Sequence, residues 1–280
     1  MKIKEVKSHI IQYDLKEELG YSQQYYQKRT GHLVEVVTDE GITGWGECFG
    51  PGNVAIANKV IVERVIQPMI LEENPLNRDV LWHKVYNLLR DHGQKGMPIQ
   101  ALSGVDIALW DILGKVTGLS ISRLIGGRFR EQVPVYGYGM MLRRENLPAL
   151  MDRFEDEAAA IKSAGFVATK MKVGLGPKQD VQLAESVRRG VGGDFPFMVD
   201  ANHCYTVDQA LYVGRALEEL DAYWFEEPVA PEDLDGYREL RSQLKINIAG
   251  GEAEFTRWGW QNLLEKHCLD IAQPEVCALG

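Results

Sequence analysis

The sequence predicts an α/β protein in two parts, a small α+β domain followed by an incomplete parallel (β/α) barrel. Two patterns lead to this prediction. Near the N-terminus, segments that alternate between apolar and polar residues precede a run of helical segments, the order expected of an α+β domain. After residue 126, short apolar runs begin at intervals of 33, 29, 26, 24 and 23 residues, the size of βα units in a parallel barrel.

Residues 1–125 are predicted to form the α+β domain, which would cap the barrel. Its alternating segments are expected to pair as an antiparallel meander, with a polar segment, 20–31, between the first two. The alternating segments are 2–13, 32–39 and 43–48. The helical segments are 55–70, 76–91 and 98–116.

Residues 126–280 are predicted to form a TIM-type (β/α) barrel, C-terminally incomplete, with about six strands. The strand candidates begin near Val135, Ala168, Phe197, Tyr223, Asn247 and Asp270. A closed barrel of this type has eight strands, and six would leave two open edges and an exposed apolar interior. Three explanations stay open: a fragment of a longer protein, a natural truncation whose edges are covered by oligomerisation, and a non-catalytic relative kept for binding or structure.

Composition and charge narrow the class of function. The chain has 45% hydrophobic and 25% charged residues, typical of a globular protein, and its net charge of −9 argues against a nucleic-acid partner. No apolar run approaches the roughly 18 residues of a membrane span, and the N-terminal MKIKEVKSHIIQYDL alternates, unlike a signal peptide. The four cysteines lack metal-ligand spacing. We therefore expect a cytoplasmic protein with no membrane or nucleic-acid partner.

Ionisable residues stand at the C-terminal ends of successive strand candidates: Lys170 and Lys172, then Asp200, Glu226 and Glu252. The carboxylates are 26 residues apart in both steps (226 − 200 and 252 − 226), so they would surround one side of the barrel mouth, where active sites of this architecture lie. Three converging carboxylates repel each other unless a hard cation joins them, and Mg²⁺ fits best. Each acid alone is equally well explained as the N-cap of the next helix, but the set favours a metal site.

The two lysines point to one side of their strand, because they are two residues apart. Beside a bound divalent cation, like-charge repulsion and partial burial favour the neutral amine, which a general base at neutral pH requires. Lys172 is nearer the mouth and is the candidate base. Lys170 would lie deeper, beside a carboxylate of the substrate or of a metal ligand, with a structural ion pair as its alternative role.

The motifs Lys-Met-Lys, Asp-Ala-Asn, Glu-Glu-Pro and Gly-Gly-Glu at these positions, with ALSGVDIALWD in the first domain, resemble the enolase superfamily in its mandelate racemase/muconate lactonizing branch. This resemblance covers the whole chain. It implies that Lys172 removes the proton alpha to a carboxylate, that Lys170 supports it, and that Asn202 lies near the metal and a substrate hydroxyl. The Mg²⁺ ligands that it implies are Asp200, Glu226 and Glu252.

Four longer stretches resemble the galactarolactone cycloisomerase and acid-sugar dehydratase group of that branch: YNLLRDHGQKG, DANHCYTV, WFEEPVAPEDLDGY and DIAQPEVCALG. This implies a small-molecule carboxylate substrate, an acid sugar or its lactone. Its enolate would undergo β-elimination, by dehydration or cycloisomerisation. The resemblance also implies a homo-oligomer. The alternative function is that of a catalytically incomplete, truncated relative that binds the metal without turnover.

Four further polar residues are candidate contacts. His203 would reach a substrate hydroxyl or simply enter the following helix. Tyr25 and Arg29, on the polar segment, would cover the substrate, and Arg29 would pair with its carboxylate unless it is solvated. Glu275 stands where the family places an Asp that orients a His on the seventh strand, and the chain has no seventh strand to supply that His.

Overall fold

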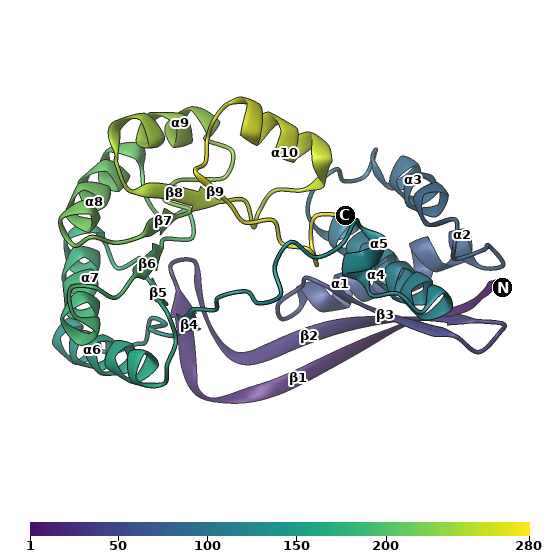
Figure 1. The fold of residues 1–280 in the computed structure, drawn as a ribbon, viewed down its shortest axis with the longest axis horizontal. Coiled ribbons are helices and arrows are strands. Elements are labelled where there is room, and N and C mark those ends of the chain that lie inside the picture. Colours follow the sequence, from purple (N-terminus) through teal and green to yellow (C-terminus); the bar gives the residue numbers. More distant parts are fainter.

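The computed structural model describes residues 1–280 and has two units, joined by an extended connection (Figure 1). The N-terminal unit contains a three-stranded antiparallel sheet, and the C-terminal unit contains a six-stranded parallel sheet with helices around its outside. A long hairpin reaches from the first unit to the second, so that its tip lies beside the first barrel strand (Figure 1). This is the predicted order of an α+β unit followed by βα units.

The antiparallel sheet consists of β1 (Ile3–Tyr21), β2 (Gln24–Thr38) and β3 (Thr43–Cys48), in that order. The polar segment 20–31, which was expected to separate two strands, is instead part of both, and the chain turns only at Ser22 and Gln23. Its tyrosines favour extended structure, and an antiparallel bridge between Gly20 and Leu142 holds its end on the barrel unit. The hairpin tip is therefore fixed beside the barrel mouth.

The helices of the N-terminal unit are α1 (Val54–Val60), a π-helical segment (Ile61–Ile66), α2 (Gln67–Ile70), α3 (Arg78–Leu89), α4 (Met97–Thr117) and α5 (Ile121–Leu124). The predicted helix 55–70 is thus continuous but widens to a π-helix at its centre. The long α4 lies directly on β3. A Cβ atom at Gly46 would stand 2.0 Å from the carbonyl oxygen of Gly104, so glycine at this position permits the close contact.

The C-terminal unit alternates strands and helices, and its strands pair in parallel in the order of the sequence. The strands are β4 (Gly137–Tyr138), β5 (Thr169–Lys172), β6 (Phe197–Asp200), β7 (Trp224–Glu226), β8 (Asn247–Gly250) and β9 (Ile271–Ala272). The helices are α6 (Leu147–Ser163), α7 (Pro177–Val191), α8 (Val207–Glu219), α9 (Leu234–Gln243) and α10 (Thr256–Glu265). β4 and β9 are the two edges, and the barrel is not closed.

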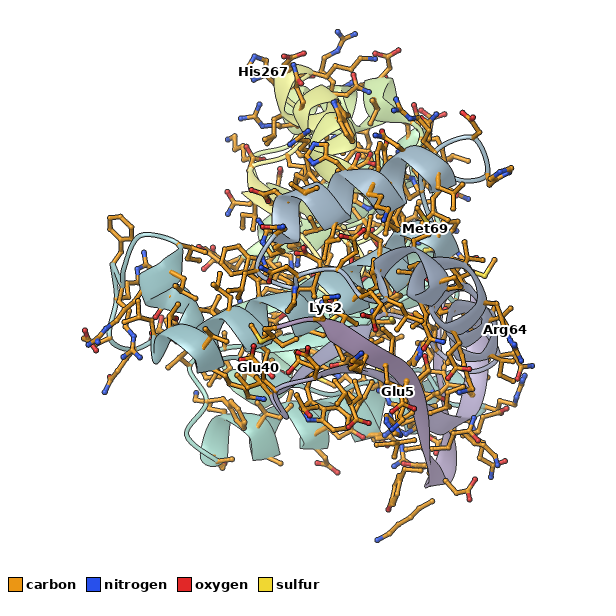
Figure 2. All side chains as sticks on the ribbon, turned by 90° about the vertical axis from the view of Figure 1, so that its right-hand side faces the viewer. Lys2, Glu5, Glu40, Arg64, Met69 and His267 are labelled. Atoms are coloured by element: carbon orange, nitrogen blue, oxygen red, sulfur yellow. The ribbon has the colours of Figure 1, made fainter.

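The hydrophobic core falls into two clusters, one of 19 buried residues between Ile3 and Ile112 and one of 28 between Met140 and Cys268. Each cluster lies on its own side of residue 125, and the domain boundary there stays a prediction. Figure 2 shows the charged side chains of Lys2 and Glu5 beside the first strand, β1. The outer edge of β1 is covered, because the backbone N–H groups of Val6 and Ser8 donate to the side chains of Gln67 and Glu63. None of the helices combines the length and the apolar character needed to cross a bilayer.

Candidate functional site

Three adjacent parallel strands end in ionisable residues. Lys172 is the last residue of β5, Asp200 of β6 and Glu226 of β7. The strand register pairs Lys172 with Asp200 and Asp200 with Glu226. The three side chains therefore start from the same level at the C-terminal edge of the sheet, and all three are buried.

The two lysines bind the two carboxylates. The Nζ atom of Lys172 lies 2.5 Å from Oδ2 of Asp200 and donates a hydrogen bond of 2.6 Å to Oδ1 of Asn202. The Nζ atom of Lys170 lies 2.6 Å from Oε1 of Glu226 and 3.2 Å from Oδ2 of Asp200. Lys170 thus joins two carboxylates, and Lys172 joins Asp200 to Asn202.

The remaining carboxylate oxygens also have donors. The backbone N–H of Asn202 donates to Oδ1 of Asp200 at 3.0 Å. The indole N–H of Trp224 and the side-chain amide of Gln273 each donate to Oε2 of Glu226 at 2.9 Å. Trp224 and Gln273 were not predicted. Trp224 could have been found, since it stands two residues before Glu226 and so faces the same side of its strand.

Burial and charge act against each other on these groups. Burial alone would lower the pKa of Lys172, but the attraction of Asp200 outweighs it and the pKa is raised. The pKa of Lys170 is raised in the same way by Asp200 and Glu226. Burial would raise the pKa of Asp200, yet the two amines hold it below its usual value. The carboxylates therefore favour the charged form of both lysines.

The pKa values of Glu226 and Glu252 are both raised, in part by the nearby negative charge of Asp200. Burial and the charge of Asp200 raise the pKa of Glu226 to about 7, although Lys170 opposes this. The surrounding protein atoms and the charge of Asp200 also raise the pKa of Glu252, even though Glu252 is exposed to solvent at the open mouth.

The structure does not bring all three predicted metal ligands together. Asp200 and Glu226 share Lys170, whereas Glu252, two residues after β8, has no hydrogen bond or ion pair from its side chain. No group of three or more His, Cys, Asp or Glu side chains is positioned to hold a metal ion. The assignment of all three acids as ligands stays a prediction.

The donor set nevertheless fits a hard divalent cation. Asp200, Glu226 and Glu252 offer carboxylate oxygens, the ligands that Mg²⁺ prefers. Burial and, after it, the charge of Asp200 raise the pKa values of Glu226 and Glu252, so a cation would relieve the repulsion between these acids. The amine of Lys170 already bridges two of these acids as a cation. A metal ion would satisfy the same oxygens.

Asn202 and His203 lie in the loop that follows β6, and both have the left-handed backbone conformation, with φ of 42° and 62°. Nδ1 of His203 is 3.2 Å from Oε2 of Glu227, without the alignment of a hydrogen bond. Burial and the charge of Glu252 raise the pKa of Glu227 to about 9, so this carboxyl is protonated at neutral pH. We call Lys170, Lys172, Asp200 and Glu226 the lysine group. Asn202 is hydrogen-bonded to this group, and His203 lies next to Asn202 in the loop.

Three other candidates lie apart from the lysine group. Arg29 is exposed and stacks on the ring of Tyr26. Tyr25 lies under the guanidinium of Arg144, 4.3 Å from its ring centre. Glu275 accepts a hydrogen bond from the backbone N–H of Cys277, two residues further on. Their predicted roles stay predictions.

Aromatic rings surround the lysines. Tyr136 and Tyr138 were not predicted, whereas Tyr21 belongs to the polar segment 20–31 that was expected to cover the substrate. The Nζ atom of Lys172 lies 5.8 Å from the ring centre of Tyr21 and 5.7 Å from that of Tyr138. Lys170 lies 5.5 Å from Tyr138 and 5.9 Å from Tyr136. Tyr138 could have been found, because β4 pairs it directly with Lys170. Tyr21 comes from the hairpin tip.

Known proteins provide an independent comparison. Two family models match, "Mandelate racemase / muconate lactonizing enzyme, N-terminal domain" over residues 14–126 and "Enolase C-terminal domain-like" over residues 153–280. D-galactarolactone cycloisomerase of Agrobacterium fabrum is 40% identical over the whole chain, which spans 72% of that protein. Arabinonate dehydratase of Saccharolobus solfataricus is 34% identical over 88% of the chain and 65% of its own length.

A solved structure agrees with these matches. A racemase from Streptomyces coelicolor A3(2), solved with bound magnesium, has a TM-score of 0.92 and 30% identity. The match covers 99% of this chain and 77% of that one. The chain therefore belongs to the enolase superfamily, in the branch of mandelate racemase and muconate lactonizing enzyme.

Proposed function

We propose that this site removes the proton alpha to the carboxylate of an acid sugar or its lactone, in a Mg²⁺-dependent reaction, and that the enolate then undergoes β-elimination. The observation that carries the proposal is the buried amine of Lys172, held by Asp200 and Asn202 at the mouth of the parallel sheet. The relatives named as a cycloisomerase and a dehydratase of sugar acids support the substrate class. We also propose that the six strands belong to a TIM-type barrel.

Each residue of the group has a role in this proposal. Asp200, Glu226 and Glu252 would hold the Mg²⁺. When bound, Mg²⁺ supplies a Lewis acid for the developing enolate and positive charge that opposes protonation of the lysines. Lys172 accepts the alpha proton on its neutral amine, and the protonated amine then donates to Asp200 and Asn202, its present partners.

The neighbours of Lys172 would orient the substrate. Lys170, deeper in the sheet, offers a positive charge to the substrate carboxylate. Asn202 and His203 stand on the loop beside Lys172 and would contact substrate hydroxyl groups, and Tyr21 and Tyr138 would exclude water from the reacting carbon. The outcome of the β-elimination depends on which β oxygen leaves the enolate: loss of a hydroxyl group gives dehydration, and loss of the ring oxygen of a lactone opens the ring.

The test is exchange of the substrate alpha proton in D₂O, over a panel of aldonates, aldarates and aldarolactones with Mg²⁺. We expect Lys172→Ala to lower the exchange rate by about 10² to 10⁴, the usual contribution of a general base. The Mg²⁺ dissociation constant, measured by calorimetry, should change little. Lys178→Ala is the matched control, because Lys178 is an exposed lysine on α7 and should exchange like the wild type.

Two outcomes would count against the proposal. Exchange that persists in Lys172→Ala would exclude Lys172 as the base. Mg²⁺ binding by the wild-type chain, with no exchange and no 2-keto product from any substrate, would favour the alternative of a metal-binding protein without turnover.

A further inference from the structure

We propose that Asp180 is a positioning residue for Lys172, because it fastens the loop after β5 to the loop after β6. The inference deepens the proposed function and rests on it. Asp180 lies in the first turn of α7 and is only 1% exposed. The hydrogen bonds of Asp180 include no residue of the lysine group. Any effect of Asp180 on the reaction would therefore be indirect.

Asp180 accepts four hydrogen bonds. Its Oδ1 atom accepts from the backbone N–H groups of Gly174, at 2.9 Å, and Leu175, at 3.0 Å. Its Oδ2 atom accepts from the N–H of Gly176, at 3.0 Å, and from the hydroxyl of Tyr205, at 2.6 Å. One buried carboxylate therefore determines the path of three consecutive residues and joins them to a second loop.

The two loops carry the two partners of one contact in the lysine group. Gly174 follows Lys172 by two residues, and Tyr205 follows Asn202 by three. Lys172 and Asn202 are joined by the hydrogen bond of 2.6 Å. Since Asp180 is hydrogen-bonded to both loops, it helps to fix the distance between the amine of Lys172 and the amide of Asn202.

The first loop needs such support because of its backbone. Gly174 and Gly176 have φ of 139° and 124°, a region that L-amino acids with side chains rarely adopt. Glycine loses more conformational freedom on folding than other residues do. Without the three hydrogen bonds to Asp180, this loop would sample many conformations, and Lys172 at its start would lose its fixed orientation.

The hairpin tip rests on the same two loops. A Cβ atom at Gly174 would lie 2.4 Å from the Cβ atom of Ser22. The hydroxyl of Ser22 and the side-chain amide of Gln23 donate to the carbonyl oxygen of Asn202, at 3.0 and 2.9 Å. Asp180 thus supports the surface on which the tip covers the mouth.

The experiment compares Asp180→Ala, Asp180→Asn and Tyr205→Phe with Asp208→Asn. Asp208 is the matched control, an exposed acid in the first turn of the next helix, α8, so it has the same helix-dipole effect without the loop contacts. For each variant, kcat and KM of alpha-proton exchange, the Mg²⁺ dissociation constant and the melting temperature are measured. Deuterium uptake by the amides of residues 174–176 reports on the loop without any substrate.

We expect kcat to fall by about 10 to 100 in Asp180→Ala, the scale of a small misplacement of a catalytic group. The decrease in kcat should be smaller in Asp180→Asn, because asparagine keeps one acceptor oxygen. It should be smallest in Tyr205→Phe. KM and Mg²⁺ affinity should stay within about twofold, and deuterium uptake should rise at 174–176 in both Asp180 variants. Asp208→Asn should match the wild type in every measurement.

Other results overturn the assignment. If the Asp180 variants melt at lower temperature but keep the wild-type kcat per folded molecule, Asp180 stabilises the fold only. Unchanged deuterium uptake at 174–176 excludes the loop contacts as the cause. If Asp180→Ala fails to fold, Asp180→Asn and Tyr205→Phe decide, and wild-type kcat in both overturns the assignment. A wild-type protein without exchange overturns the proposed function together with it, whereas an active wild type with active Asp180 variants overturns the assignment alone.

Discussion

Two of the buried polar groups in the chain are built in opposite ways. At the barrel mouth, Lys170, Lys172, Asp200 and Glu226 are ionisable groups in which every carboxylate oxygen has a donor. In the N-terminal unit, Ser8, His32 and Asn58 are equally buried but uncharged. The hydroxyl of Ser8, both ring nitrogens of His32 and Oδ1 of Asn58 have no hydrogen-bond partner in the chain.

The N-terminal group lies between the sheet and α1. His32 is paired with Cys48 across β2 and β3, and burial together with the charge of Lys59 lowers the pKa of its imidazole, against the charge of Glu63. Lys59 and Glu63 form an ion pair. Lys59 donates to the carbonyl oxygen of Ser8 at 3.0 Å, and Glu63 accepts from the N–H of Ser8 at 3.1 Å. Both contacts involve the backbone of Ser8, and its hydroxyl group has no hydrogen-bond partner.

The difference between the two groups indicates which of them is better explained by function than by stability. A buried ion pair is often no more stable than apolar side chains of the same volume, so four paired ionisable groups at one edge of the sheet are poorly explained by stability. An unpaired neutral group costs about 1–3 kcal/mol and provides no strong charge for chemistry. The charged group is therefore the candidate for function, and the neutral group is a local weakness of the fold.

The largest effect is expected from Asp200→Ala. This change leaves two buried amines with one carboxylate, and breaking such a pair typically costs about 3 kcal/mol of unfolding free energy. Urea denaturation measures the loss. The matched control is the double variant Lys170→Met/Glu226→Gln, which removes both members of a pair and should cost distinctly less. Equal losses in both proteins would show that the cost comes from packing and not from unpaired charge.

A smaller effect is expected from acid titration of His32. Its pKa is lowered in the fold, so the folded protein binds fewer protons than the unfolded chain. The unfolding free energy should therefore fall as the pH drops below the unfolded-state pKa of about 6.5. The leucine of His32→Leu cannot bind a proton. The unfolding free energy of this variant should therefore decrease less between pH 7.5 and pH 5.5. Parallel losses in the two proteins would assign the pH dependence to other groups.

The ends of the barrel strands were predictable from the sequence for a physical reason. Parallel strands linked by helices place their C-terminal ends at one edge, so one acid per βα unit predicts Asp200 and Glu226 side by side, as the register shows. Glu252 has the same spacing, but its side chain lies two residues beyond its strand, after Gly251 with φ of 112°. The direction of a side chain on such a turn does not follow from spacing.

The contacts between distant segments were not predictable. Gln273 reaches Glu226 across 47 residues, and Ser22 reaches Asn202 across 180. Neither contact has a periodic pattern, because each depends on how a loop leaves a strand. Asp180 illustrates the same limit. In the sequence it is an ordinary acid in the first turn of a helix, and only the folded loop shows its four donors.

The smallest effect is expected from Ser8→Ala, which tests the neutral group. Its hydroxyl is buried without a partner, so removing it should change the unfolding free energy by less than about 1 kcal/mol and in the stabilising direction. Thr38→Val is the comparison, because the buried Thr38 hydroxyl donates to the carbonyl of Ile42 at 2.9 Å and accepts from its N–H at 3.0 Å. That variant should lose about 1 kcal/mol. If Ser8→Ala loses as much, the Ser8 hydroxyl is hydrogen-bonded in solution, and the two buried groups differ in charge alone.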